Sequence, residues 1–446
     1  MPNRTPVFLD GLYGKLVENG IAYFFPSAKI ETITTGLDEG RQRISQNPDG
    51  SLTLNWLGSQ YLLDSGKAFS DSEVKLLKSI GTVLDSRYRM IFDVTLAGQQ
   101  FDLFGGLPED RFVSAYVDSG PYAGNVWKGP DRVEDAIEVL RTTSLSTYEN
   151  RRISTGTLLF GTQPDPCHAL PSTPSGALRY SPALTSIRSF YRLCDGLQTL
   201  ALVDRQGYLV EIIDVEQWAD AVSHTELPVP SPDRYQIHSR ATLCGGHVCM
   251  ILTANGEMKI LANGVQTFRF LGGRWRLTDA EQKYDLWSRA IGNSELAERL
   301  FVAALNLAED RRGGLLVVLA DPCSVTKLVS KTDLISSFPN HDAQSISGSK
   351  DQLHYLLRQK RVLDLPTAVL ETVARIDGGI VLDRSSNLLA FGAILRHHDV
   401  MAFHPENIEG GRTTAAIAAS RFGSVLKVSE DGLVSFFQNG NCIWDM

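Results

Sequence analysis

The sequence lacks paired cysteines, long apolar runs and an excess of basic residues, and each absence excludes a class of protein. Its six cysteines are spread over 446 residues without a CxxC pair, which fits reduced thiols better than a disulfide framework or a structural zinc site. No stretch approaches the roughly 18 uninterrupted apolar residues of a membrane-spanning helix. The net charge of −8, with acids and bases mixed along the chain, argues against an extended nucleic-acid surface.

Common targeting and catalytic signatures are also missing. The N-terminal stretch MPNRTPVFLDGLYGKL has no long apolar core, so we expect no signal peptide and a cytoplasmic location. The sequence contains no GxxxxGK, GxSxG or HExxH motif, which argues against common ATPases, hydrolases and zinc proteases.

What the sequence does contain is an internal repeat. CMILTANGEMKILANG at 249–264 and VLKVSEDGLVSFFQNG at 425–440 align without a gap, and each reads as strand, glycine-containing turn, strand and Asn-Gly. Upstream, LALVDRQGYLVEI at 200–212 parallels GIVLDRSSNLLAF at 379–391. Two further segments, 149–167 and 309–323, each contain an acid, Arg-Arg, a strand and Asp-Pro-Cys. Each of them follows a helix-patterned stretch.

The repeat divides the chain into three predicted parts, in line with a length that suggests two to four domains. Residues 1–130 form an N-terminal α/β domain, in which Ser70 and Glu73 make the capping box of a helix. Residues 131–275 are repeat one and residues 276–446 are repeat two. Helices alternating with paired hairpins in each repeat predict an α/β fold with mixed β-sheets flanked by helices.

Three features of repeat two predict a phosphate and metal site. Asp377-Gly378-Gly379 places a carboxylate beside bare backbone where a strand begins. EGGRTTAAIAAS, residues 409–420, opens a helix with two glycines and Arg412, a combination that favours an anion. VSEDG, residues 428–432, puts Glu430 at a strand end, and two carboxylates near phosphate donors are typical of a divalent metal and nucleotide site.

In this order the three motifs resemble those of the diadenylate cyclase domain, the nucleotide-binding domain of the DNA-integrity scanning proteins. That family carries Asp-Gly-Ala, then Gly-Thr-Arg-His-Arg-Ala-Ala, then Val-Ser-Glu-Glu. The resemblance covers about 150 residues and implies ATP binding, with Mg²⁺ or Mn²⁺ held by Asp377 and Glu430 and no organic cofactor. Two such domains meet face to face in the family and join two ATP molecules into cyclic di-AMP. The nucleotide contacts that it implies are Asp377, Gly378, Gly379, Gly410, Gly411, Arg412, Thr413, Thr414 and Ser429.

The sequence departs from the family pattern in both repeats. Thr413 and Thr414 stand where the family has His and a second Arg, which removes charge stabilisation that phosphoryl transfer relies on. In repeat one, Gln198 and Ala254 stand opposite the two acids, and only His238 and Arg240 remain as a predicted phosphate segment.

Three functions therefore stay open. The first is a bacterial sensor of a nucleotide or cyclic dinucleotide, with adenine favoured, which signals through a second copy of the chain or a separate effector protein. The second is an active diadenylate cyclase, with Asp377 as a catalytic residue. The third is an interaction scaffold that binds no nucleotide.

Overall fold

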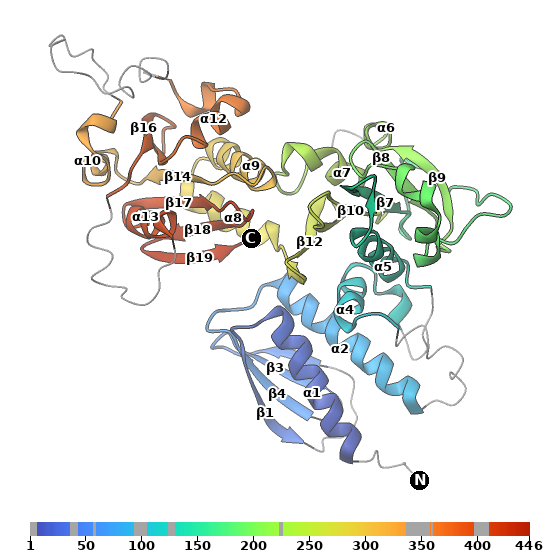
Figure 1. The fold of residues 1–446 in the computed structure, drawn as a ribbon. Helices are drawn as coiled ribbons and strands as arrows, with labels where there is room; N and C mark the ends of the chain where they lie inside the picture. The colour runs from blue at the N-terminus through green and yellow to red at the C-terminus, as the bar shows by residue number, and fades with distance from the viewer. Residues whose placement is uncertain are drawn as a thin grey trace. The chain divides into compact units, whose positions relative to one another are not determined.

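A computed structural model gives the fold (Figure 1). It divides the chain into two compact units, Met1–Leu227 with Ile237–Asp279, and Pro228–Gln236 with Ala280–Met446. The structure describes residues 7–35, 43–56, 59–92, 105–123, 130–222, 226–335, 357, 360–396 and 410–446.

The first unit begins with helices packed on a four-stranded antiparallel sheet of order β1-β4-β3-β2. The predicted capping box is confirmed, because the Glu73 N–H donates to Ser70 Oγ at 3.0 Å and the Ser70 N–H donates to Glu73 Oε2 at 2.9 Å. The elements are α1 (Val7–Phe24), β1 (Lys29–Thr35), β2 (Arg43–Gln46), β3 (Leu52–Trp56), β4 (Ser59–Asp64), α2 (Asp71–Phe92) and α4 (Pro108–Val117).

The same unit continues into a seven-stranded mixed sheet of order β13-β12-β11-β10-β7-β8-β9. Its elements are α5 (Arg132–Ser144), β5 (Thr147–Tyr148), β6 (Arg151–Arg152), β7 (Thr155–Leu159), β8 (Thr199–Val203), β9 (Leu209–Asp214), α6 (Val215–Asp220), α7 (Gln236–Ala241), β10 (Val248–Leu252), β11 (Met258–Ala262), β12 (Val265–Leu271) and β13 (Arg274–Leu277).

The second unit is a six-stranded mixed sheet of order β16-β15-β14-β17-β18-β19 between two helical layers. Because side chains alternate along a strand, Val317 and Phe437 pack with α13, whereas Phe436 meets Trp287 of α8 on the opposite face. The elements are α8 (Ala280–Ile291), α9 (Ser294–Glu309), β14 (Gly314–Leu319), α10 (Val325–Leu328), α12 (Thr367–Ala374), β15 (Gly379–Asp383), β16 (Leu388–Ala393), α13 (Gly411–Ser420), β17 (Gly423–Val428), β18 (Val434–Gln438) and β19 (Asn441–Asp445).

The two large sheets share one topology. In each, the central strand pairs parallel with the next strand in the chain (β7 with β8, β14 with β15). On its other side it pairs antiparallel with a strand that enters from a later helix (β10 and β17). The repeated Asn-Gly turns also match, since Asn263 and Asn439 have φ values of 54° and 52°. The chain is therefore an α/β protein with mixed sheets flanked by helices.

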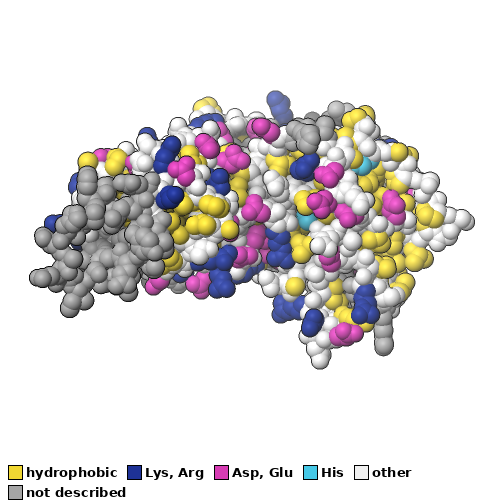
Figure 2. All heavy atoms as spheres, turned by 90° about the horizontal axis from the view of Figure 1, so that it is seen from above, with side chains coloured by type: hydrophobic (Ala, Val, Ile, Leu, Met, Phe, Trp, Pro, Cys, Tyr) yellow, Lys and Arg dark blue, Asp and Glu magenta, His cyan; other side chains and the backbone are white. Residues whose placement is uncertain are grey.

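The division into units falls between Asp279 and Ala280, while the boundary predicted near residue 276 stays a prediction. The boundary predicted at residue 130 separates segments that share a core, because Val17 and Leu54 belong to the same buried cluster as Leu159 and Trp275. An independent domain at 1–130 stays a prediction. On the face shown in Figure 2, acidic and basic side chains of the described residues are interspersed, in line with the mixed charge of the sequence.

Buried charges join α4 to α5 in the first unit. Arg111 lies 3.5 Å from Asp131 and 3.4 Å from Glu134, and Ser114 and Tyr122 donate hydrogen bonds to Asp131. Burial raises the pKa of Glu134 to about 8, against the attraction of Arg111.

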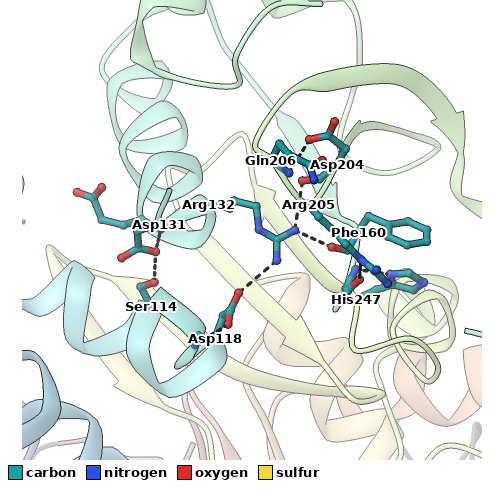
Figure 3. Close-up of polar contacts among 12 residues, drawn as sticks. Ser114, Asp118, Asp131, Arg132, Phe160, Asp204, Arg205, Gln206 and His247 are labelled. Carbon is teal, nitrogen blue, oxygen red and sulfur yellow. Dashed lines mark hydrogen bonds and ion pairs between the residues drawn. The ribbon is translucent and has the colours of Figure 1, made fainter. Parts of the chain in front are cut away.

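Next to this group, Arg132 joins the helices to the seven-stranded sheet (Figure 3). Its Nη1 donates to the carbonyls of Phe160 at 2.6 Å and Asp204 at 3.2 Å, and its Nη2 lies 3.2 Å from Asp118. The guanidinium therefore fixes the ends of β7 and β8 to the start of α5.

We predict that Glu134→Gln makes the first unit less sensitive to alkaline pH. The folded chain holds the Glu134 proton up to about pH 8, whereas an unfolded chain releases it near the ordinary glutamate value of 4.5. Stability from this group is therefore full below that lower value and falls as pH rises through 8, by at most about 1.4 kcal/mol per pH unit. Urea unfolding of wild type and variant at about pH 6 and pH 8.5 measures the difference.

Glu211→Gln is the matched control, because Glu211 lies in β9 of the same unit with its side chain exposed and does not contribute to the Glu134 shift. Its free energy of unfolding should follow the wild-type pH dependence. An equal pH response in wild type and Glu134→Gln would contradict the assignment of this proton.

Candidate functional site

Strand directions in the second unit bring the predicted acids to one end of the sheet. Asp377 lies just before β15, which runs parallel to β14, and Glu430 lies just after β17, which runs antiparallel to β14. Gly314, the first residue of β14, pairs with Val428, the last residue of β17. The backbone positions of Asp377 and Glu430 are thus separated by two strand spacings, or about 10 Å across the end of the sheet. Both are exposed.

Arg412 joins this end of the sheet from α13. Its Nη1 donates to Glu430 Oε1 at 2.9 Å, and the two side chains are 42% and 71% exposed. A Cβ on Gly313 would collide with the guanidinium, so Arg412 lies across the start of the central strand β14. An exposed pair of this kind adds little to stability, which leaves Arg412 available to a stronger anion.

Lys427 is a second cation at this site, and the sequence reasoning missed it. Its Nζ donates to Thr413 Oγ1 at 3.2 Å, and it lies in β17, the strand that precedes Glu430. The available signal was a lysine inside the otherwise apolar run VLKV. Thr414, by contrast, is buried and its hydroxyl donates to the Gly410 carbonyl at 3.4 Å, while Ser429 shapes the β17–β18 turn by accepting the Gly432 N–H.

The glycines beside Asp377 have a structural explanation. Gly378 has a φ of 114°, and a Cβ there would lie 2.5 Å from the carbonyl carbon of Gly392 in β16. Both conditions exclude larger residues. Gly379 would meet Leu315 at 3.4 Å, an ordinary contact. The bare backbone at Gly378 therefore allows β15 to pack closely on β16. This packing fixes the backbone at the start of β15, next to Asp377.

Gly410 and Gly411 differ from that pair. Gly410 precedes α13 with a φ of 91°, and within the described residues no side chain caps the helix there. Gly411 is exposed, lacks a positive φ, and a Cβ at that position would meet no described atom within 4 Å. Neither packing nor backbone strain in the described structure requires glycine at 411, whereas close approach of a ligand to the helix N-terminus would.

The corresponding end of the sheet in repeat one is closed by the chain itself. Gly196 lies against the Thr155 backbone at the start of β7, and Asp195 Oδ1 accepts the N–H groups of Leu197, Gln198 and Thr199 at 2.8–3.0 Å. Burial raises the pKa of Asp195, but these hydrogen bonds lower it by more, so that the pKa lies below its ordinary value.

The predicted phosphate segment of repeat one is split between interior and surface. His238 is 1% exposed and its Nε2 lies 3.1 Å from the Gly196 carbonyl, so this side chain supports the fold. Arg240 is half-buried on the same short helix α7.

A second group of chemically active side chains, also missed in the sequence, lies in repeat one. Ligand atoms of Asp165, His168 and His247 lie within 4.8 Å of one another, although 82 residues separate the first from the last. His168 and His247 both meet Asp165 Oδ2, at 2.9 and 2.6 Å. Cys167 and Cys244 adjoin them: burial, the Cys167 thiol and the Asp165 charge all raise the pKa of Cys244.

Comparisons with known proteins identify no relative for the chain. No protein-family model matches it, and no curated protein matches it. Among solved structures, it is similar to a chain described as the hypothetical membrane spanning protein from Bacillus cereus, with 20% identity over 36% of this chain and 69% of that one. The TM-score of 0.26 is too low for this similarity to carry an argument. Among the helices that the structure describes, none is long and apolar enough to cross a bilayer.

We predict that Gly378→Ala destabilises the second unit much more than Gly379→Ala. The first substitution forces a side chain into a left-handed backbone and against Gly392, at a combined cost above about 2 kcal/mol. The second adds a methyl group at ordinary contact distance and should cost less than about 1 kcal/mol. Equal losses in denaturant unfolding would contradict the packing explanation for Gly378.

Proposed function

We propose that the second unit binds a nucleotide or cyclic dinucleotide at the end of its sheet, as a sensor derived from diadenylate cyclase in bacterial nucleotide signalling or defence. The observation that carries this proposal is the convergence of Asp377, Arg412 and Glu430, which come from three separate motifs, at the one end of the sheet where β14 and β15 begin and β17 ends.

Charge and backbone at this end suit the phosphates of such a ligand. No described side chain caps the N-terminus of α13, which offers backbone N–H groups, and glycine at 411 leaves space for an anion next to them. Arg412 and Lys427, which donates to Thr413, would add two positive charges. A phosphate that displaces Glu430 from Arg412 frees that carboxylate for a cation.

A divalent ion fits the remaining donors. Asp377 and Glu430 offer the carboxylate oxygens that Mg²⁺ and Mn²⁺ prefer, and both side chains are exposed. Such an ion, when bound with the nucleotide, supplies charge neutralisation between the phosphates and the two acids. Within this scheme Arg412 binds and orients the phosphates.

The alternative is an active diadenylate cyclase that joins two ATP molecules. The retained acids and the additional cation Lys427 favour it, whereas Thr413 and Thr414 in place of a histidine and an arginine weaken it. Because repeat one has closed its own sheet end with Asp195 and Gly196, a second active site would have to come from another copy of the chain. We favour the sensor, with an adenine nucleotide as ligand, a cytoplasmic location, and a second copy or an effector protein as partner.

Incubation with ATP and Mn²⁺, read by mass spectrometry, separates the two functions. We expect unchanged ATP from a sensor, together with Mn²⁺-dependent ATP binding in calorimetry that Asp377→Ala abolishes. A cyclic dinucleotide product would establish the cyclase instead. Absence of binding by wild type to ATP and to cyclic di-AMP would overturn both.

We predict that Arg412→Ala weakens ATP binding selectively. Loss of a charge-assisted hydrogen bond to phosphate costs about 1.5–3 kcal/mol, or roughly ten- to a hundredfold in affinity, while adenosine binding stays the same. Gly411→Ala should act in the same direction with unchanged thermal stability, because its Cβ projects into open space.

Arg421→Ala provides the matched control for calorimetry. Arg421 is the C-cap of the same helix, at the opposite end from the proposed ligand, so its loss should leave ATP affinity unchanged. Equal weakening of ATP and adenosine in Arg412→Ala would exclude a phosphate contact.

A further inference from the structure

The Asp165, His168 and His247 cluster is built by two tightly packed loops of the first unit. One follows β7, and the other, with Gly245 and Gly246, precedes β10. A Cβ on Gly161 would collide with the Gly245 carbonyl, and one on Gly245 would lie 2.8 Å from His247 Nε2. Only glycine lets the loops approach this closely, so the cluster is held by the backbone on both sides.

Hydrogen bonds fix the tautomer of each histidine. The Trp218 carbonyl, 3.0 Å from His168 Nε2, can only accept, so that nitrogen carries a proton. The Gly161 N–H donates to His247 Nδ1 at 2.9 Å, so the His247 proton lies on Nε2 and points at Asp165. The His168 ring also stacks on Trp218, with centroids 3.8 Å apart and planes inclined by 3°.

These tautomers leave two electron-pair donors face to face. In its neutral form, His168 presents an unprotonated Nδ1 to Asp165 Oδ2 at 2.9 Å, inside a cluster whose His168 and Asp165 side chains are 8% and 2% exposed. Such an arrangement needs a cation between the two atoms, either a proton or a metal ion. A metal-bound histidine whose other N–H donates to a backbone carbonyl is the usual arrangement in proteins, and Trp218 provides that carbonyl.

Two cysteines belong to the same two loops. Cys167 is the residue before His168, Cys244 precedes Gly245, where a Cβ would lie 2.9 Å from Asp165 Cβ, and both cysteines are half-buried. Thiolate, imidazole and carboxylate together form a donor set for Zn²⁺ and similar transition metals, and they disfavour Mg²⁺ or Ca²⁺.

The second unit contains the same turn without the histidines. Asp321 Oδ1 accepts the Cys323 N–H at 3.0 Å, as Asp165 Oδ1 accepts the Cys167 N–H at 2.8 Å. Ser324 follows where repeat one has His168, and Gly423 takes the place of His247. The turn therefore folds without either histidine, so turn formation does not explain their presence in repeat one.

We propose that Asp165, Cys167, His168 and Cys244 form a site for Zn²⁺ or a chemically similar divalent transition metal, with His247 as a positioning residue. His168 binds through Nδ1 and Asp165 through Oδ2, and the thiolates reach the ion by rotation of the cysteine side chains. His247 donates its Nε2–H to Asp165 and holds the carboxylate in place. The site lies in the first unit and does not depend on nucleotide binding by the second.

Titration of the metal-free full-length chain with Zn²⁺ and Co²⁺ tests the site. We expect one equivalent of Zn²⁺ by dialysis and elemental analysis, and a Co²⁺ complex with thiolate charge-transfer absorption and the intense visible bands of tetrahedral coordination. His168→Gln and Cys244→Ser should each weaken binding by at least about tenfold. The matched controls Asp321→Asn and Cys323→Ser alter the equivalent turn of the second unit and should bind metal as wild type does.

Absence of stoichiometric binding by wild type would overturn the proposal. Undiminished affinity in His168→Gln would also overturn it. If His168→Gln does not fold by circular dichroism, the wild-type Co²⁺ spectrum decides, because a complex without thiolate absorption excludes this ligand set.

Discussion

The central strand of each large sheet pairs parallel with one neighbour and antiparallel with the other, and both candidate sites follow from this constraint. In the second unit, β14 and β15 begin where β17 ends, so residues before the first two strands and after the third must meet. For this reason Asp377, Gly313 and Glu430 lie at the same end of the sheet. The helix α13 leads into β17, and the chain after β17 reaches Glu430. Arg412, at the start of α13, therefore lies beside Glu430 at the same end of the sheet.

The two repeats use opposite ends of one topology. In repeat one, the end that corresponds to the proposed nucleotide site carries Asp195, whose carboxylate accepts three backbone N–H groups. The other end, where β7 finishes and β10 starts, carries Asp165 and His247, because Leu159 pairs with Val248. The two sheets thus carry their candidate sites at different ends.

Local patterns made the fold predictable, while contacts between distant segments were not. The hairpins, the capping box at Ser70 and the helix over Ser294–Glu309 follow from periodicity and turn residues, and the structure confirms them. The approach of Asp165 to His247 depends on the pairing of β7 with β10, which no short motif encodes. The purpose of Gly378 was also hidden, because its need for glycine arises from the backbone of Gly392 on another strand.

The N-terminal elements have a physical connection to the histidine cluster. Arg132 holds the Phe160 carbonyl at 2.6 Å, and the next residue, Gly161, donates the N–H that sets the tautomer of His247. Asp118, at the end of α4, anchors the same guanidinium. In the second unit, the helix α9 begins with a side-chain N-cap, Asn293, as α5 begins with Asp131. Asp118 thus helps to position a loop of repeat one, and N-terminal residues such as Val17 and Leu54 share a buried core with that repeat.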